Sequence, residues 1–196
     1  MRIPSIVRRF HFFLLAALIP AIAWGADKPL GIQKWSLSPH GSSVTWREKL
    51  QISNIEADPE KVDGVESAGF EIKGNGEDFG YLDVIGSFDD EVDLTPFQSL
   101  VFSYQVTGQS SQPISMEVIL VGPTMKQQLR GACGEGLEAD GKWHRVEVSL
   151  SSLRQAGGQE WDKADARSVY LLIHCGGKRT INVKMKLGGF KLTSGK

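Results

Sequence analysis

Five short runs of alternating apolar and polar residues follow one another in the second half of the chain, with turn residues between them. The runs are SLVFSYQVTG at 99–108, ISMEVILVG at 114–122, KWHRVEVSL at 142–150, SVYLLIHC at 168–175 and INVKMKLGGFKL at 181–192. A period of two places successive side chains on opposite faces of a sheet. No long helical pattern interrupts these runs. The sequence therefore predicts an all-β protein, folded as an antiparallel β-sandwich.

The first part of the chain is less regular. Two strands are expected at 69–73 and 80–86, and Gly-Asn-Gly at 74–76 favours a short hairpin between them. A first strand is expected at 44–50 and a loop at 53–64. Residues 151–156 and 159–167 are each expected to hold an isolated helical turn. The helical turns are too short to make this an α/β protein.

The N-terminus has the features of a secretory signal peptide. Three arginines and no acid precede an apolar stretch at 12–22, and Ala21 and Ala23 give the small-x-small pattern before Trp24. The apolar stretch is short for a membrane span, although an uncleaved anchor is the alternative. We therefore expect residues 1–23 to be removed and the protein to be exported, to a periplasm or the extracellular space, without a membrane span after cleavage.

Cleavage would leave residues 24–196, a length that suits a single domain with a substantial core. The mature chain would hold nineteen basic and twenty-three acidic residues, a net charge of −4, which disfavours binding to nucleic acid. The charge is unevenly spread, since 56–93 holds thirteen acids and 178–196 holds six basic residues and no acid. These segments are expected either to pair across adjacent strands or to form two separate solvated faces.

Cys133 and Cys175 are the two cysteines of the chain. Strand parity places each of them on the core-facing side, together with Leu129 and Ile173 respectively. In an exported protein this arrangement predicts a disulfide, and two buried free thiols are the alternative.

No catalytic motif stands out. GLEADGK at 136–142 has the spacing of a phosphate-binding loop, but Trp143 occupies the position of the metal-binding Ser or Thr. His40, His144 and His174 lack metal-ligand spacing, and no serine lies in a nucleophile elbow. We therefore expect no enzymatic activity, no catalytic residue and no cofactor.

Two stretches carry a resemblance to known domains. The acidic turn and the strand after it include Asp93, Leu94, Thr95, Phe97 and Leu100, and a later strand includes Gly141, Trp143, Val146, Val148, Leu150 and Leu153. With these motifs, residues 66–192 resemble the galactose-binding-like jelly rolls, which include carbohydrate-binding modules and the complex I intermediate-associated protein family. The resemblance implies a jelly-roll fold. DGKWHRV at 140–146 also resembles laminin-G and concanavalin-like sandwiches, the alternative fold.

One departure concerns calcium. Many such modules bind a structural calcium through acids in the last strand, where this chain has Gly188 and Gly189. The resemblance therefore gives no calcium ligand there. Oxygen ligands could still come from a loop that contains Asp89, Asp90, Glu91 and Asp93.

A glycan site needs aromatic rings for the apolar faces of sugars and planar polar groups for their hydroxyls. Trp143 begins the best-matched packing strand and is expected in the core. The candidates are instead side chains that point away from the core-facing positions of the strands. The candidate ligand-binding residues are Tyr81, Asp83, Gln105, Glu117, Tyr170 and His174.

The expected function is non-catalytic binding of a polysaccharide or oligosaccharide by an exported module. The alternative is an assembly or chaperone-like factor that binds another exported protein, and a small jelly-roll glycosidase or lyase comes third. A groove with exposed aromatic rings would favour the glycan, whereas a flat apolar patch would favour a protein partner.

The signal segment gives a direct prediction. The exported protein should begin near Trp24 or Ala26, because the small residues before these positions suit a signal peptidase. N-terminal mass analysis of the purified protein measures this. A major species that still begins at Met1 would contradict the prediction.

Overall fold

A computed structural model describes residues 27–41, 50–76, 80–134, 136–175 and 178–194. The predicted signal peptide and all but the last residue of the strand expected at 44–50 lie outside these residues.

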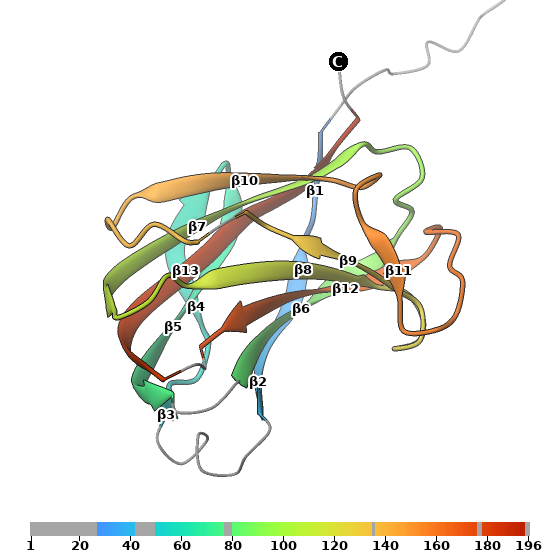
Figure 1. Ribbon diagram of the computed structural model, residues 1–196. Coiled ribbons are helices and arrows are strands. Elements are labelled where there is room, and N and C mark those ends of the chain that lie inside the picture. Colours follow the sequence, from blue (N-terminus) through green and yellow to red (C-terminus); the bar gives the residue numbers. More distant parts are fainter. Residues whose placement is uncertain (1–26, 42–49, 77–79, 135, 176–177, 195–196) are drawn as a thin grey trace, which may run out of the picture.

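The described residues form two antiparallel sheets that pack face to face (Figure 1). The strands in chain order are β1 (Lys28–Pro29), β2 (Ile32–Gly41), β3 (Leu50–Ile52), β4 (Glu56–Val62), β5 (Val65–Gly76), β6 (Gly80–Val92), β7 (Ser99–Ser110), β8 (Ser115–Val121), β9 (Gln128–Ala132), β10 (Trp143–Ser149), β11 (Arg154–Ala156), β12 (Ala166–His174) and β13 (Arg179–Thr193). The described residues contain no helix. The predicted all-β sandwich is confirmed, and its five alternating runs are β7, β8, β10, β12 and β13.

The first sheet, called sheet A here, has the order β10-β7-β13-β5-β3, with β1 paired to β13 and β4 paired to β5. The second, sheet B, has the order β11-β9-β8-β12-β6-β2. In the described part of the chain, no helix is both long and apolar enough to cross a membrane.

The core fills the space between the sheets with the inward side chains of both. Phe102 on β7 and Phe190 on β13 are fully buried and stack with ring centroids 5.1 Å apart. β13 reaches this contact through a bulge, at which Gly189 and Phe190 together oppose Phe102. Gly189 has a φ of 66°, which suits the first position of such a bulge. The bulge shifts the inward parity from odd to even residues, so that Leu187 and Phe190 both point into the core.

Three expectations for the irregular segments are wrong. β5 and β6 do not form a hairpin, because β5 pairs with β13 in sheet A whereas β6 pairs with β12 in sheet B. Residues 56–62 of the expected loop form β4, which pairs with β5. Neither expected helical turn is present, and residues 154–156 form the short edge strand β11 instead.

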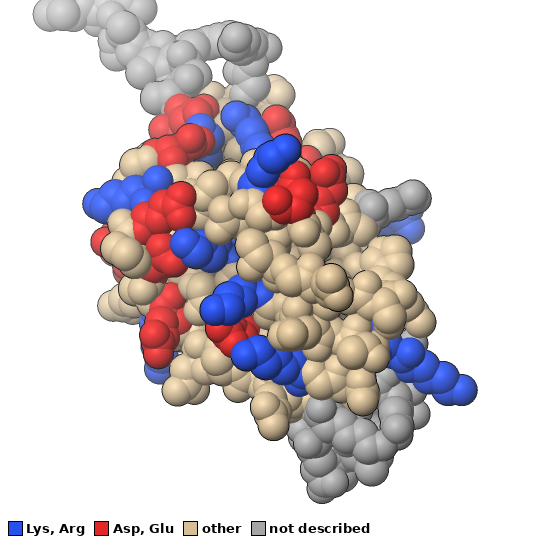
Figure 2. All heavy atoms as spheres, turned by 90° about the vertical axis from the view of Figure 1, so that its left-hand side faces the viewer, with Lys and Arg blue, Asp and Glu red and all other residues tan. Residues whose placement is uncertain are grey.

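The acidic and basic segments of the chain meet across sheet A. Lys186 on β13 lies 2.9 Å from Asp58 and 3.0 Å from Glu60, and Lys184 lies 2.8 Å from Glu71. Lys184, followed by Lys73, lowers the pKa of Glu71 to about 2. Figure 2 shows the resulting pattern, in which basic and acidic side chains alternate on one side of the molecule. The expectation that these segments pair is therefore confirmed.

Trp143 is not a core residue, contrary to expectation. It is the first residue of β10, and its side chain lies half-buried on the outer face of sheet A, next to Gln105. Its indole Nε1 donates to Glu60 Oε1 at 2.8 Å, which attaches β4 to this face. The inward positions of β10 are held by Val146 and Val148, one residue out of phase with Trp143.

The predicted disulfide is also wrong, because Cys133 and Cys175 are both free. Their parity is as expected, since Cys175 is fully buried and Cys133 packs against the core. However, β8 lies between the strands that lead to them. Two strand spacings amount to about 10 Å, whereas bridged cysteines need Cα atoms within about 7 Å.

Both thiols should therefore be present and unreactive in the native protein. Burial raises the pKa of Cys133 and of Cys175 to about 12, so almost no thiolate exists at neutral pH. A thiol reagent at pH 7.5 should label neither cysteine before unfolding and both afterwards, without a reductant. Protein whose mass is two units below the reduced value, and which gains no label on unfolding, would contradict this prediction.

Candidate functional site

The outer face of sheet B gathers aromatic and polar side chains. Along β6, Leu82 and Val84 are fully buried in the core, so Tyr81, Asp83 and Ile85 point to the opposite side. The same alternation applies to β12, β8 and β9. The outward residues of these four strands, together called the sheet B face, are Tyr81, Asp83, Ile85, Ser87, Ser115, Glu117, Ile119, Val121, Gln128, Arg130, Ala132, Ser168, Tyr170, Leu172 and His174.

Strand register arranges these side chains in rows that cross the sheet. The central row runs through Ile85, Tyr170, Ile119, Arg130 and Arg154, each a direct cross-strand partner of the next. It begins with an apolar part around one aromatic ring and ends in two cations. A ligand that lies across the strands would meet these groups in succession.

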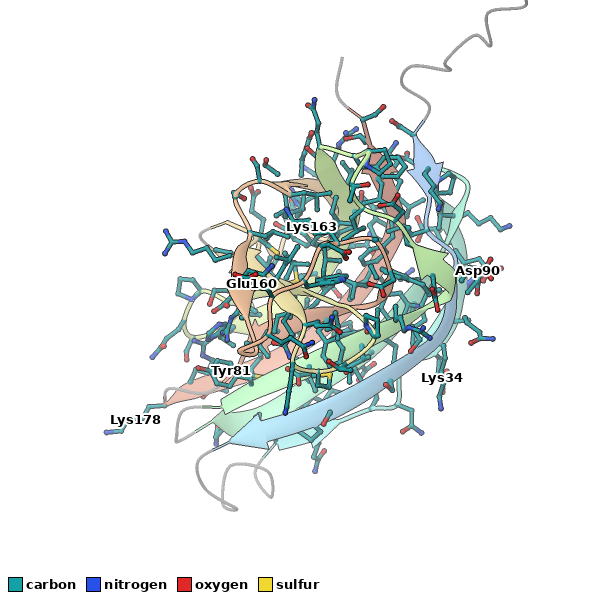
Figure 3. All side chains as sticks on the ribbon, turned by 90° about the vertical axis from the view of Figure 1, so that its right-hand side faces the viewer. Lys34, Tyr81, Asp90, Glu160, Lys163 and Lys178 are labelled. Atoms are coloured by element: carbon teal, nitrogen blue, oxygen red, sulfur yellow. The ribbon has the colours of Figure 1, made fainter. Side chains whose placement is uncertain are left out.

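A hollow with a volume of about 280 Å³ lies over this part of the sheet. Its lining residues are Tyr81, Asp83, Ile119, Met125, Gln128, Arg130, Tyr170 and Leu172. The loop between β8 and β9 forms one wall, because Met125 reaches the ring of Tyr170, whose hydroxyl donates to Met125 Sδ at 3.4 Å. Figure 3 shows Tyr81 at one end of β6 and Asp90 toward the other end.

A chain of polar contacts fixes the side chains at one end of the sheet B face. Tyr81 and His174 meet edge to face, with ring centroids 4.7 Å apart. His174 Nε2 lies 3.1 Å from Glu117 Oε1, and Glu117 Oε2 accepts a hydrogen bond from Arg130 Nε. Arg130, and to a smaller extent His174, lowers the pKa of Glu117. Glu117 is therefore an ionised acceptor with a fixed orientation.

Asp83 and Tyr170 also line the hollow. Asp83 is only 9% exposed, and Tyr170 is half-buried. Burial, and secondarily the Asp83 carboxylate, raises the pKa of the Tyr170 hydroxyl, which stays a neutral hydrogen-bond donor at physiological pH. The hollow thus presents two aromatic rings beside a carboxylate.

A second hollow, with a volume of about 510 Å³, adjoins the first across Arg130. It is lined by Glu117, Arg130, Gly131, Ala132, Ser152, Arg154, Gln155 and Ala156. The two hollows share Arg130 and extend the central row toward the β11 edge of the sheet.

Five of the six candidate ligand residues lie together on the sheet B face: Tyr81, Asp83, Glu117, Tyr170 and His174. Their role in binding stays a prediction. The expectation that Gln105 shares this surface is wrong, because β7 belongs to sheet A. The Gln105 amide instead donates to the Gly141 carbonyl at 2.8 Å, beside Trp143.

Sequence reasoning missed Arg130, Ile119 and Met125. The sequence does indicate the position of Arg130, because the alternation that places Leu129 and Cys133 on the core side places Arg130 on the outer side. Met125 carried no signal, because it lies in the loop between two strands and reaches Tyr170 only through the fold.

In the described part of the chain, the group of residues that could hold a metal ion lies near the start of β10. Ligand atoms of Glu138, Asp140 and His144 lie within 4.8 Å of one another near the start of β10, where His144 Nε2 is 2.7 Å from Asp140 Oδ1. In the acidic turn considered for calcium, Glu91 pairs with Arg167, and Asp93 Oδ1 accepts from the Thr95 amide at 2.8 Å. These contacts engage two of the four acids, Glu91 and Asp93, with protein partners.

No family model matches the chain. No curated protein matches it either. Among solved structures, it is similar to the family 11 carbohydrate-binding module of Clostridium thermocellum, solved with a β-1,3-1,4-mixed-linked tetrasaccharide. The identity is 16% and the TM-score 0.54, over 85% of this chain and 95% of that one.

The family 30 carbohydrate-binding module of a cellulosomal cellulase from the same organism matches with 9% identity and a TM-score of 0.54. That match covers 86% of this chain and 98% of the module. At this identity the likeness establishes the fold, a jelly-roll β-sandwich as in carbohydrate-binding modules. The comparisons give no support to the resemblance to the complex I intermediate-associated protein family.

The Glu117 ion pair predicts a pH-dependent contribution to stability. Because the folded-state pKa of Glu117 lies below its ordinary value of 4.5, its contribution is fully present above about pH 5 and is lost as the pH falls through the folded-state value. Glu117→Gln should lower the free energy of unfolding at pH 7 by up to about 1 kcal/mol, measured by urea denaturation. The difference from the wild type should shrink in acid.

Glu147→Gln is the matched control, because Glu147 lies on the other sheet and pairs with Arg145 at 3.6 Å with both side chains exposed. It should change stability less than Glu117→Gln does. A Glu117→Gln effect that grows on acidification would contradict the assigned direction of the pKa shift.

Proposed function

We propose that this protein is a non-catalytic carbohydrate-binding module that holds a polysaccharide or oligosaccharide on the sheet B face. The observation that carries the proposal is the hollow in which Tyr81 and Tyr170 lie beside Asp83 and Arg130. Aromatic rings with nearby planar polar groups are what sugar recognition needs. The likeness to the fold of carbohydrate-binding modules supports the same function.

Each group has a physical role in this proposal. The tyrosine rings stack on the apolar faces of sugar rings and remove them from water. Asp83, Glu117 and His174 accept or donate hydrogen bonds to hydroxyls. Because Arg130 and His174 already fix Glu117, little side-chain entropy is lost when a sugar binds it. A sugar with a misplaced hydroxyl would leave buried polar groups unpaired, which gives selectivity.

Two features favour this function over the alternatives. Among the described residues, Met125 is the one large apolar side chain that is exposed, and it lines the hollow beside Tyr170, which favours a grooved glycan site over a flat protein interface. A glycosidase needs a carboxylic acid whose pKa is raised, so that it can donate a proton. The pKa of Glu117 is shifted in the opposite direction, which suits an acceptor rather than a general acid.

The proposal includes export to a periplasm or the extracellular space, where polysaccharides are accessible. Its basis is the charge and apolar pattern of residues 1–23. Carbohydrate binding at the sheet B face does not depend on it.

Substitution of the tyrosines tests the site. Tyr170→Ala and Tyr81→Ala should each weaken polysaccharide binding by about 1 to 3 kcal/mol, because each removes a stacking ring. Calorimetry or affinity electrophoresis against a panel of soluble polysaccharides measures this change. Thermal unfolding should show that both variants remain folded.

Trp143→Ala is the matched control, since it removes an aromatic side chain from the outer face of sheet A. It should leave binding unchanged in a folded protein. If no polysaccharide binds the wild-type protein, the carbohydrate-binding function is refuted and the alternative, binding of a protein partner, is favoured. If binding survives both tyrosine substitutions, the sheet B face is not the site.

A further inference from the structure

Two arginines face each other at the β11 edge of the sheet B face. Arg130 on β9 and Arg154 on β11 are direct cross-strand partners, so both side chains are on the same side of the sheet. Both are exposed, and both line the hollow of about 510 Å³. Like charges in directly opposite positions destabilise a sheet unless an anion lies between them.

Among the described residues, only one of the two arginines has an anionic partner. Glu117 binds Arg130, and Glu117 with Asp83 contributes to raising the pKa of that guanidinium. Within the ranges that the structure describes, Arg154 has no ion-pair partner. The hollow therefore ends in a cationic group that no described acid neutralises.

This cationic end is aligned with the aromatic part of the site. Tyr170, Ile119, Arg130 and Arg154 occupy successive strands in one row. Strand spacing puts Arg130 about 10 Å and Arg154 about 14 Å from Tyr170. A sugar chain that stacks on Tyr170 and runs across the strands would bring a neighbouring sugar over the two arginines.

We propose that the ligand is an acidic polysaccharide, and that this hollow binds the carboxylate of a uronic acid residue through Arg154, assisted by Arg130. This inference rests on the proposed carbohydrate-binding function and names its substrate class. A guanidinium is a planar donor that matches a carboxylate in two parallel hydrogen bonds. The acidic character of the whole chain does not oppose this, because acids such as Asp58, Glu60 and Glu71 pair with lysines on sheet A.

The experiment compares polysaccharides that differ in the carboxylate. Wild-type protein is titrated by calorimetry at physiological ionic strength with polygalacturonate, with its methyl-esterified form, with a neutral mixed-linkage β-glucan and with dextran sulfate. The variants are Arg154→Gln and, as a matched control, Arg145→Gln, which removes an exposed arginine from sheet A. Thermal unfolding of each variant checks the fold.

Wild-type protein should bind polygalacturonate on the order of tenfold more tightly than the esterified form, because a charged hydrogen-bonded pair is lost on esterification. Arg154→Gln should weaken polygalacturonate binding by a similar factor and leave any neutral glucan binding unchanged. Arg145→Gln should behave as the wild type does.

Other outcomes overturn the inference in distinguishable ways. Binding of the neutral glucan without binding of polygalacturonate would leave the carbohydrate function intact and refute the acidic ligand. Equal losses in Arg154→Gln and Arg145→Gln would show general charge attraction instead of a site. Tighter, Arg154-dependent binding of dextran sulfate would assign the hollow to sulfate and contradict the carboxylate. Failure of every polysaccharide would refute the proposed function itself.

Discussion

The burial of every second side chain between the two sheets is the constraint on which the rest of the structure depends. Once Leu82, Val84 and Ile173 fill the core, their neighbours along the strands must lie on the outer face. Each central strand of sheet B therefore contributes to the interior and to the sheet B face at once. A one-residue shift in register would exchange the two sets of side chains. The core thus holds the site in place.

The order of strands then decides which outward side chains become neighbours. β12 lies between β6 and β8, so Tyr170 has Ile85 on one side and Ile119 on the other. The polar contact chain crosses the same strands from Tyr81 through His174 and Glu117. These contacts connect side chains from β6, β12 and β8. In the proposed polysaccharide binding, a sugar would meet a Glu117 carboxylate that Arg130 and His174 already hold in place, which lowers the entropy cost of binding.

The alternation of residues was enough to predict the five main strands and the outward direction of Tyr170 and Glu117. It could not predict sheet membership, because the same pattern occurs in both sheets, and Gln105 was therefore placed on the wrong surface. The disulfide prediction failed for the same reason, since parity says nothing about the strand between Cys133 and Cys175. The packing motif that Trp143 begins predicts a core position for this residue, which is wrong. The odd spacing between Trp143 and the buried Val146 indicates the outer face instead.

The proposed ligand contacts lie on the sheet B face. Titration of isotope-labelled protein with a soluble oligosaccharide, followed by amide chemical shifts in NMR spectra, tests this most directly. The largest shifts should occur in β6, β12, β8 and β9 around Tyr81, Tyr170 and Arg130. Shifts confined to β7, β10 and β13, around Trp143 and Gln105, would place the ligand on sheet A and contradict binding on the sheet B face.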